Sequence, residues 1–164
     1  MKQRPPPSLR ARALGWLAQR EHSRSELQRK LLRHVQADEA APADSADQVA
    51  RLLDALQAQG LLSEARFVES RVRQRAAGMG TKRIEFELAQ HGLTLPPQAL
   101  QQLRASELQR ATELCRRRFD TPPGDARERA RRMRFLAGRG FSGDAIRRAL
   151  AGADAGSDEE SPGD

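Results

Sequence analysis

The chain has 164 residues, of which 38% are hydrophobic and 31% charged, and its net charge is +7. Five Phe, one Trp and no Tyr indicate a thin core of Leu, Ala and Val. One cysteine excludes an internal disulfide, and no apolar run approaches the roughly 18 residues that a membrane-spanning helix needs. No apolar signal-peptide core follows the basic N-terminus, so we expect a cytoplasmic protein.

The first helical repeat is predicted over residues 8–60, after a disordered lead at residues 1–7. Its first helix, residues 8–20, carries an apolar face made of Leu9, Ala13, Trp16 and Leu17. Ser23 and Glu26 then form a capping box, in which the hydroxyl of Ser23 accepts a hydrogen bond from the N–H of Glu26. The helix that begins there runs to about residue 34. An Ala/Pro/acidic linker over residues 38–44 precedes a third helix, which ends at Gly60.

The second repeat is predicted over residues 61–104. It opens at Ser63, turns at Gly78-Met79-Gly80 and continues in a helix with Thr81 as its N-cap. The apolar spacing buries Ile84 and Leu88, and the last helix, near residues 97–103, is expected to be short or irregular because prolines precede it.

The third repeat is predicted over residues 105–151. A helix from about 106 to 119 buries Cys115, which we expect to be structural rather than reactive. A helix over residues 125–137 is expected to turn Ala130, Met133 and Ala137 inward, and a last helix runs from Ser142 to Leu150. Residues 152–164 are predicted to be a disordered acidic tail.

A unit of similar design therefore occurs three times, with predicted N-caps at Ser23, Thr81 and Ser142. These caps stand 58 and 61 residues apart, and a period near 60 made of short helices is typical of a tandem array. The predicted fold is all-α, with three tandem three-helix repeats, each similar to a helix-turn-helix, in an elongated array that can curve.

The residues that could catalyse a reaction do not form a known motif. The three histidines are far apart in sequence, the single cysteine has no pair, and no phosphate-binding glycine loop follows a strand. The segment Gly78-Met79-Gly80 follows a helix and is interpreted as a turn. We therefore expect a protein that is not an enzyme and that uses no cofactor, metal or small-molecule substrate.

The basic residues indicate a polyanionic partner. Residues 114–139 hold nine arginines against three acids. Arg127, Arg131 and Arg134 follow i, i+4, i+7 on one predicted helix and form a basic ridge. The pattern alone fits DNA, an acidic protein or a solvated face. The predicted partner-binding residues are Arg71, Arg75, Lys82, Arg83, Arg116, Arg117, Arg127, Arg131, Arg132, Arg134 and Arg147.

Four blocks in order resemble the RecX family of regulators of the bacterial recombinase RecA. They are REHSRSEL from Arg20, GLLSEARF from Gly60, GxG from Gly78 followed by Arg83-Ile84, and RGFS from Arg139 followed by Ile146. The matching residues, which we interpret as structural, are Arg20, Glu21, His22, Ser23, Glu26, Leu27, Gly60, Phe67, Gly78, Gly80, Ile84, Gly140, Phe141 and Ile146. The chain departs from the family pattern at Glu64, Val68, Gly143 and the acidic tail.

The resemblance implies tandem three-helix repeats that bind the groove of a RecA–DNA filament. It further implies suppression of ATP hydrolysis, strand exchange and the co-protease activity of the SOS response, with only weak, non-specific binding to DNA alone and no membrane partner. The alternative is a stand-alone DNA-binding protein similar to helix-turn-helix domains, in which the helix after Ser23 or Ser142 enters a major groove. Few Asn or Gln near those N-termini count against that alternative.

Overall fold

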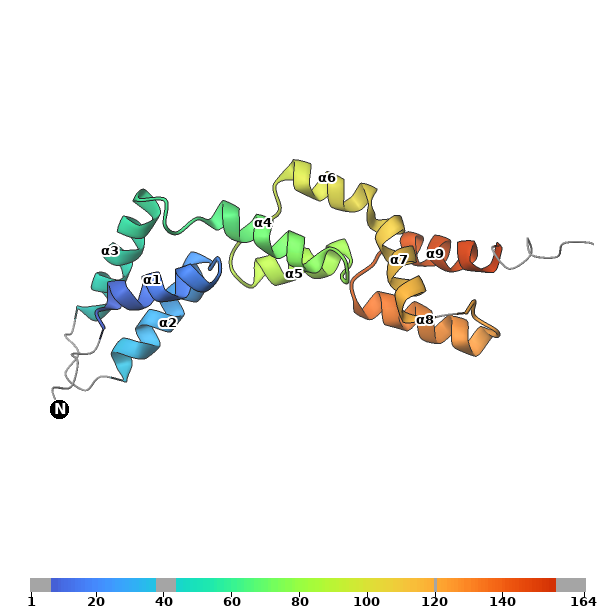
Figure 1. Cartoon of the computed structure of the whole chain (residues 1–164), viewed down its shortest axis with the longest axis horizontal. Helices are drawn as coiled ribbons and strands as arrows, with labels where there is room; N and C mark the ends of the chain where they lie inside the picture. Colours follow the sequence, from blue (N-terminus) through green and yellow to red (C-terminus); the bar gives the residue numbers. More distant parts are fainter. Residues whose placement is uncertain (1–6, 38–43, 120, 156–164) are drawn as a thin grey trace, which may run out of the picture. The chain divides into compact units, whose positions relative to one another are not determined.

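The structure is a computed structural model that describes residues 7–37, 44–119 and 121–155. These residues form nine α-helices and no strand, which confirms the all-α prediction (Figure 1). The chain divides into two units whose boundaries fall at residues 70/71, 90/91 and 93/94, so that residues 91–93 belong to the first unit. The predicted lead (1–7) and linker (38–44) lie outside the described residues except for residues 7 and 44, and so does most of the 152–164 tail. The start of the tail is a correction, because the last helix continues to Ala155.

The first unit packs three helices around one apolar cluster: α1 (Leu9–Gln19), α2 (Arg24–Gln36) and α3 (Ser45–Ala58). The buried members of the cluster are Ala13, Leu27, Leu31, Val35, Val49, Leu53, Leu56 and Leu62, and Trp16 packs against them as predicted. α3 ends near Gly60, whose φ of +68° allows the N–H of Leu61 to reach the carbonyl of Leu56 at 2.9 Å.

The second unit contains most of the remaining helices, and α4 (Glu64–Arg75) runs into it from the first unit. Its own helices are α5 (Thr81–Ala89), α6 (Pro97–Ala105), α7 (Glu107–Arg118), α8 (Ala126–Gly138) and α9 (Gly143–Ala155). The buried cluster consists of Ala111, Leu114, Cys115, Leu136, Phe141, Ile146, Ala149 and Leu150. Burial raises the pKa of the Cys115 thiol, which is therefore neutral at pH 7.

The turn between α4 and α5 packs its backbone directly on the turn between α8 and α9. The N–H of Gly80 donates to the carbonyl of Arg139 at 2.8 Å, and a Cβ on Gly80 would lie 2.2 Å from the backbone of Gly140. Gly140 has a φ of +81°, and a Cβ there would lie 2.5 Å from the backbone nitrogen of Arg83. Both positions require glycine because no side chain fits between the two main chains.

A buried carboxylate joins the first residues of two helices. Glu107 is only 6% exposed and accepts a hydrogen bond from the N–H of Thr81 at 2.8 Å. The hydroxyl of Thr81, together with the hydroxyl and N–H of Ser142, also hydrogen-bonds this carboxylate. Burial raises the pKa of Glu107, but the hydrogen bonds outweigh burial and leave the pKa below its ordinary value. The ionised carboxylate therefore stabilises the N-termini of α5 and α9.

The predicted helix caps are correct at two of three positions. The hydroxyl of Ser23 accepts from the N–H of Glu26 at 3.1 Å, and that of Ser142 accepts from the N–H of Ala145 at 3.3 Å. Thr81 is a correction, because it is the first residue of α5 and Gly80 is the N-cap. The carboxylate of Glu107 supplies the acceptor that Gly80 lacks.

The guanidinium of Arg110 binds carbonyls at the C-terminal ends of two helices. Arg110 is buried and donates to the carbonyl of Ala76 at 2.9 Å, just after α4, and to that of Leu103 at 2.8 Å, in the last turn of α6. It also donates to the carbonyl of Met79. Cationic donors at these positions satisfy carbonyls that have no partner within their own helix.

The inward face of α8 differs from the prediction. Met133 is 40% exposed and Ala137 is exposed, whereas Arg132 and Leu136 are buried. Arg132 takes the inward position because its guanidinium stacks on the ring of Phe119, with 4.5 Å between its central carbon and the ring centroid. The apolar periodicity of this helix was misleading because an arginine occupies a core position.

We predict that Gly140→Ala lowers the free energy of unfolding by about 1–3 kcal/mol. The positive φ is unfavourable for alanine, and the added Cβ would clash with Arg83. Gly138→Ala is the matched control, since Gly138 is helical and a Cβ there meets nothing within 4 Å. Urea unfolding followed by circular dichroism should show Gly138→Ala as stable as the parent or up to about 1 kcal/mol more stable. Equal stability of the two variants would contradict the packing described for the turns.

We also predict that Glu107→Gln lowers the free energy of unfolding at pH 7 by about 1–3 kcal/mol, because the charge-assisted hydrogen bonds are lost. The lowered pKa of Glu107 makes its stabilising effect complete above the unfolded-state pKa of about 4.3 and weaker as the pH falls through the folded-state pKa. Unfolding of the parent should therefore become easier below about pH 5, and the Gln variant should show a shallower pH dependence. Glu113→Gln, at an exposed glutamate of the same helix, is the control. It should leave the free energy of unfolding and its pH dependence as they are in the parent.

Candidate partner interface

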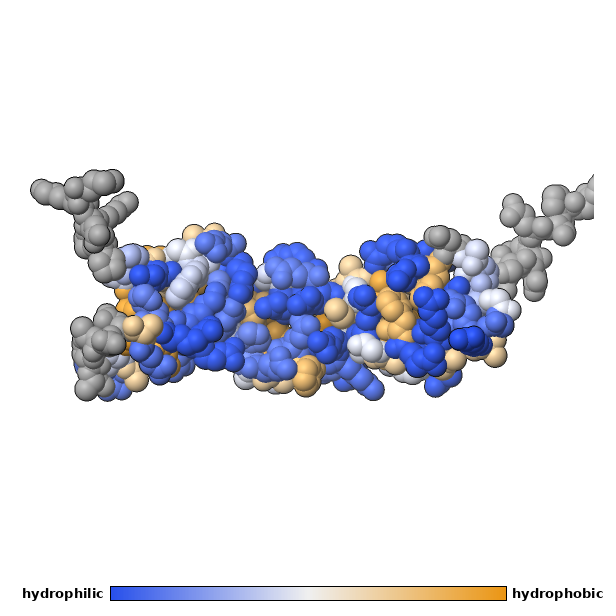
Figure 2. All heavy atoms as spheres, turned by 90° about the horizontal axis from the view of Figure 1, so that it is seen from below, coloured by the Kyte–Doolittle hydropathy of each residue, from blue (hydrophilic) through white to orange (hydrophobic). Residues whose placement is uncertain are grey.

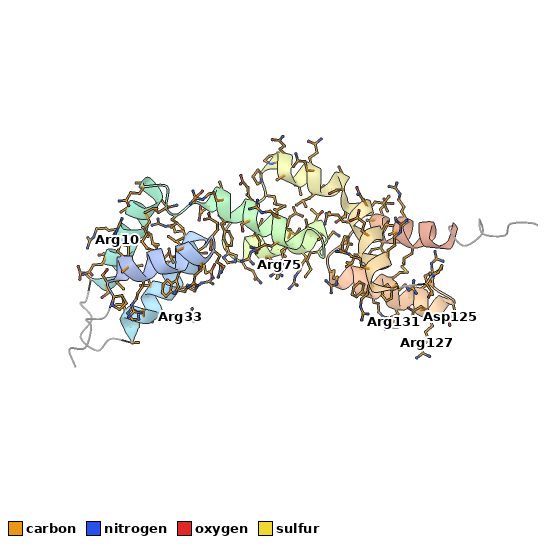
Figure 3. All side chains as sticks on the ribbon, in the orientation of Figure 1. Arg10, Arg33, Arg75, Asp125, Arg127 and Arg131 are labelled. Carbon is orange, nitrogen blue, oxygen red and sulfur yellow. The ribbon has the colours of Figure 1, made fainter. Side chains whose placement is uncertain are left out.

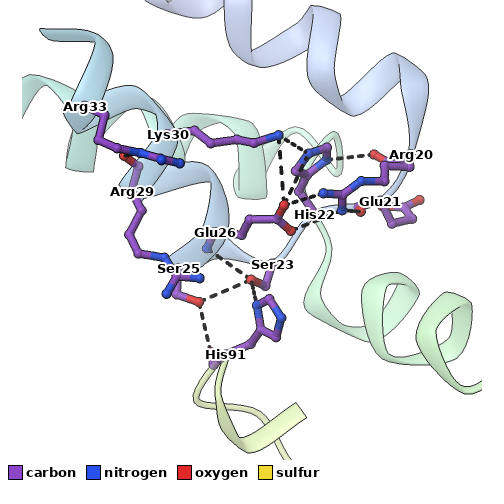
Figure 4. Close-up of polar contacts among 10 residues, drawn as sticks. All are labelled: Arg20, Glu21, His22, Ser23, Ser25, Glu26, Arg29, Lys30, Arg33 and His91. Carbon is purple, nitrogen blue, oxygen red and sulfur yellow. Dashed lines mark hydrogen bonds and ion pairs between the residues drawn. The ribbon is translucent and has the colours of Figure 1, made fainter. Parts of the chain in front are cut away.

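The family-like residues of the α1–α2 turn bind one another (Figure 4). Arg20 forms a two-pronged ion pair with Glu26, in which one guanidinium nitrogen lies 3.1 Å from Oε2. Glu21 accepts from Arg66 at 2.7 Å, and the hydroxyl of Ser23 lies 2.7 Å from Nδ1 of His91. These contacts give the motif a structural role within the first unit.

His22 is a buried, neutral member of the same turn. It is 1% exposed, and its Nδ1 lies 2.9 Å from the carbonyl of Arg20, which can only accept. The proton is therefore on Nδ1, and Nε2 accepts from the ammonium of Lys30 at 3.0 Å. Burial lowers the pKa of His22, and the cations Arg20 and Lys30 lower it further, against the opposing effects of the hydrogen bond to the Arg20 carbonyl and of Glu26.

The predicted basic ridge on α8 is exposed. Arg127, Arg131 and Arg134 all face solvent, and Figure 3 shows Arg127 extending away from the helix. Arg131 pairs with Glu128 at 3.3 Å in an exposed contact that leaves most of its guanidinium accessible. The side chains of Arg127 and Arg134 have no ion-pair partner among the described residues.

Arg132 is a correction to the predicted partner-binding set. Its side chain is 6% exposed, its Nε lies 3.1 Å from Glu128, and another nitrogen donates to the carbonyl of Thr121 at 2.7 Å. With its remaining face on Phe119, this guanidinium has no free edge to offer a phosphate.

A second exposed basic group lies on α4 and α5. Arg75 and Arg83 share the carboxylate of Glu87, at 3.0 Å and 3.5 Å, and Lys82 is exposed beside them. Arg71 and Arg75 are both half-buried, and Arg71 has an interaction of its own.

The other predicted arginines differ in exposure and in their hydrogen-bond partners. Arg116, on α7, is exposed, whereas Arg117 donates to the carbonyl of Ala77 at 2.6 Å. Arg147, on α9, pairs with Asp144 at 3.5 Å but remains largely exposed. The structure therefore distributes the predicted residues over several helices and does not gather them into one pocket.

Positive charge dominates the part of the second unit before residue 153. Residues 71–90 and 94–152 contain 18 Arg and Lys but eight Asp and Glu, and residues 153–164 add five acids, so the whole unit remains positive. Glu107 is buried, and Glu87, Glu128 and Asp144 each face two arginines. Hydrophilic residues cover most of the face seen in Figure 2. Such a surface suits a polyanion.

Several surface residues were missed by the sequence analysis. Arg73, Arg118 and Arg148 are exposed basic residues, and Phe86 is an exposed aromatic residue. A helical-wheel argument could have found Phe86, because it lies two residues from both Ile84 and Leu88, on the side opposite the buried stripe.

Other classes of site find no support in the described residues. They contain no cluster of three or more metal-ligating side chains and no helix long and apolar enough to cross a membrane. A cavity of about 220 Å³ is lined by residues of α7, α9 and the segment after α7, Cys115 among them. Two arginines line it, of which Arg132 already binds Glu128 and the carbonyl of Thr121, whereas Arg116 lies at the surface.

Comparison with known proteins identifies the family. Residues 63–94 match the second three-helix domain of RecX, and residues 105–150 match its third three-helix domain. A regulatory protein RecX from Leptothrix cholodnii is 51% identical over 92% of both chains. One from Ralstonia nicotianae is 47% identical over 93% of this chain and 92% of its own.

A solved structure shows the same fold. The crystal structure of RecX from Lactobacillus salivarius matches with a TM-score of 0.60 and 19% identity, over 90% of this chain and 95% of that one. The fold, the two domain matches and the extent of identity lead to one conclusion: this chain belongs to the RecX family.

Proposed function

We propose that this protein regulates a RecA-type recombinase by binding in the groove of the recombinase–DNA filament. The family membership supports a regulatory role, and the resemblance discussed above associates that role with RecA. In this proposal the protein inhibits ATP hydrolysis and strand exchange, and with them the co-protease activity of the SOS response. Binding, rather than a chemical step, carries the effect.

The observation that carries the proposal is the exposed, under-compensated positive charge of the second unit. The ridge on α8 and the group on α5 each present guanidinium or ammonium groups that can reach phosphate or carboxylate oxygens. Several moderate contact sites on one chain strengthen one another through effective concentration, provided that the partner is long enough to meet them together. A filament satisfies this condition better than a small ligand does.

The N-termini of α2 and α9 do not favour the helix-turn-helix alternative. Arg24, at the start of α2, pairs with Asp54 at 2.7 Å, and Ser25 donates to the carbonyl of His91 at 3.1 Å. At the start of α9, Asp144 places negative charge where a DNA backbone would approach. Both helices therefore lack the free N-terminal side chains that read bases in a major groove.

We predict that changing Arg127, Arg131 and Arg134 together to Ala weakens binding to a preformed recombinase filament by about tenfold or more. Exposed contacts of about 0.5–1 kcal/mol each would give a loss of this size. The fold should persist, since alanine is the better helix former and the three side chains face solvent. Recombinase ATP turnover on single-stranded DNA, measured with and without each variant, gives the functional effect.

The control for that experiment removes the same charge elsewhere. Arg10, Arg51 and Arg104 are exposed arginines on α1, α3 and α6, and their triple alanine variant should regulate the recombinase nearly as the parent does. Equal regulation by both triple variants would show that the ridge is only a solvated face. Failure of the parent protein to alter recombinase activity would refute the proposed function itself.

We further predict that binding to naked DNA is weak, independent of sequence and strongly dependent on salt. The slope of log affinity against log salt should be about −0.7 per phosphate contact on single strands and about −0.9 on duplex DNA. The ridge variant should reduce the magnitude of this slope by about two units if its three arginines contact phosphates. A marked preference for one duplex sequence would favour the helix-turn-helix alternative.

A further inference from the structure

α5 presents an aromatic ring to solvent beside several cations. Phe86 is 54% exposed, more than any other large apolar side chain in the described part of the chain. The two buried apolar residues of the helix, Ile84 and Leu88, hold the opposite face inward and so fix the direction in which Phe86 projects. A single exposed apolar side chain is common on protein surfaces, so the functional argument for Phe86 depends on the charged side chains beside it.

The side chains beside this ring are charged and held by specific contacts. The central guanidinium carbon of Arg83 lies 5.7 Å from the centroid of the Phe86 ring. Glu87 restrains Arg83 at 3.5 Å while also pairing with Arg75, so one carboxylate is shared by two arginines. The backbone of Arg83 is itself fixed by its close packing against Gly140. Lys82, one turn before Phe86, is exposed.

The other side of the ring is open along the helix. Ala89 and Gln90, three and four residues after Phe86, are its helical neighbours, and both are exposed. The methyl group of Ala89 covers little of an adjacent ring, and the amide of Gln90 can donate to or accept from a base edge. In chain order, α5 and its C-cap residue thus offer the ammonium of Lys82, the guanidinium of Arg83, the ring of Phe86 and the amide of Gln90.

We infer that Phe86 and Arg83 form a stacking platform for a base of single-stranded DNA, with Lys82 contacting the adjacent phosphate. The inference deepens the proposed function, on which it rests, because it names the part of the filament that α5 meets. An exposed ring with a guanidinium and an ammonium on one side matches the alternation of flat bases and phosphates along a single strand. An apolar protein partner would require a wider patch, and no other large apolar residue of α5 is exposed.

The test compares variants of Phe86 in binding to a fluorescent oligothymidine. Phe86→Ala and Phe86→Leu should both weaken binding by about tenfold, because stacking on a base requires a π-face that leucine lacks. Met133→Ala, at the exposed apolar residue of α8, is the matched control and should bind as the parent does. Retention of parental affinity by Phe86→Leu would overturn the stacking role.

A spectroscopic measurement gives an independent result. In Phe86→Trp, the added indole emission should be quenched by oligothymidine, whereas the emission added by Met133→Trp should not. Absence of quenching in a well-folded Phe86→Trp variant would overturn the inference. Weaker binding of Phe86→Ala to the recombinase without DNA, combined with unchanged binding to oligothymidine, would assign the ring to a protein contact instead.

The two proposals can fail separately. Variants of Phe86 that bind oligothymidine as the parent does, while the parent regulates recombinase ATP turnover, would refute the platform and leave the proposed function standing. A parent protein without effect on the recombinase would refute the proposed function whatever the variants bind. Circular dichroism of each variant verifies that α5 remains folded.

Discussion

Helix ends are the constraint on which the second unit depends. Every helix leaves backbone donors and acceptors without partners at its ends, and a chain with many short helices has many such ends. In this unit Glu107 satisfies two N-termini, and Arg110 satisfies carbonyls at the ends of α4 and α6. Both residues lie on α7, three positions apart. One face of α7 therefore binds the ends of α4, α5, α6 and α9, and the apolar cluster packs beside these contacts.

Arginine serves two purposes in this protein. Arg110 and Arg132 are buried, donate to backbone carbonyls and lie over aromatic rings. Arg127 and Arg134 are exposed and without ion-pair partners in the part of the chain that the structure describes. A guanidinium suits both uses because it combines a flat surface for stacking with a fork of donors at its edge. The cluster of basic residues in the sequence thus contains both part of the core and part of the surface.

The sequence predicted the helices well because their apolar residues recur at the helical period and capping residues mark their starts. Ser23, Ser142 and Gly60 could be assigned for this reason. Thr81 could not be assigned correctly, because its partner is a carboxylate from a helix distant in sequence. The inward face of α8 was misjudged for a similar reason, since the ring that covers Arg132 comes from the segment after α7. Local pattern predicts local structure, whereas partners from elsewhere in the chain remain invisible to it.

The contact between Gly80 and Gly140 has a consequence for how such chains diverge. Because main-chain atoms make the contact, it constrains two positions to glycine and places no demand on neighbouring side chains beyond their backbone geometry. Substitutions around the two turns can then accumulate without separating the helices that the turns connect. A backbone contact of this kind is compatible with extensive change in the side chains around it, provided that the two glycines are kept.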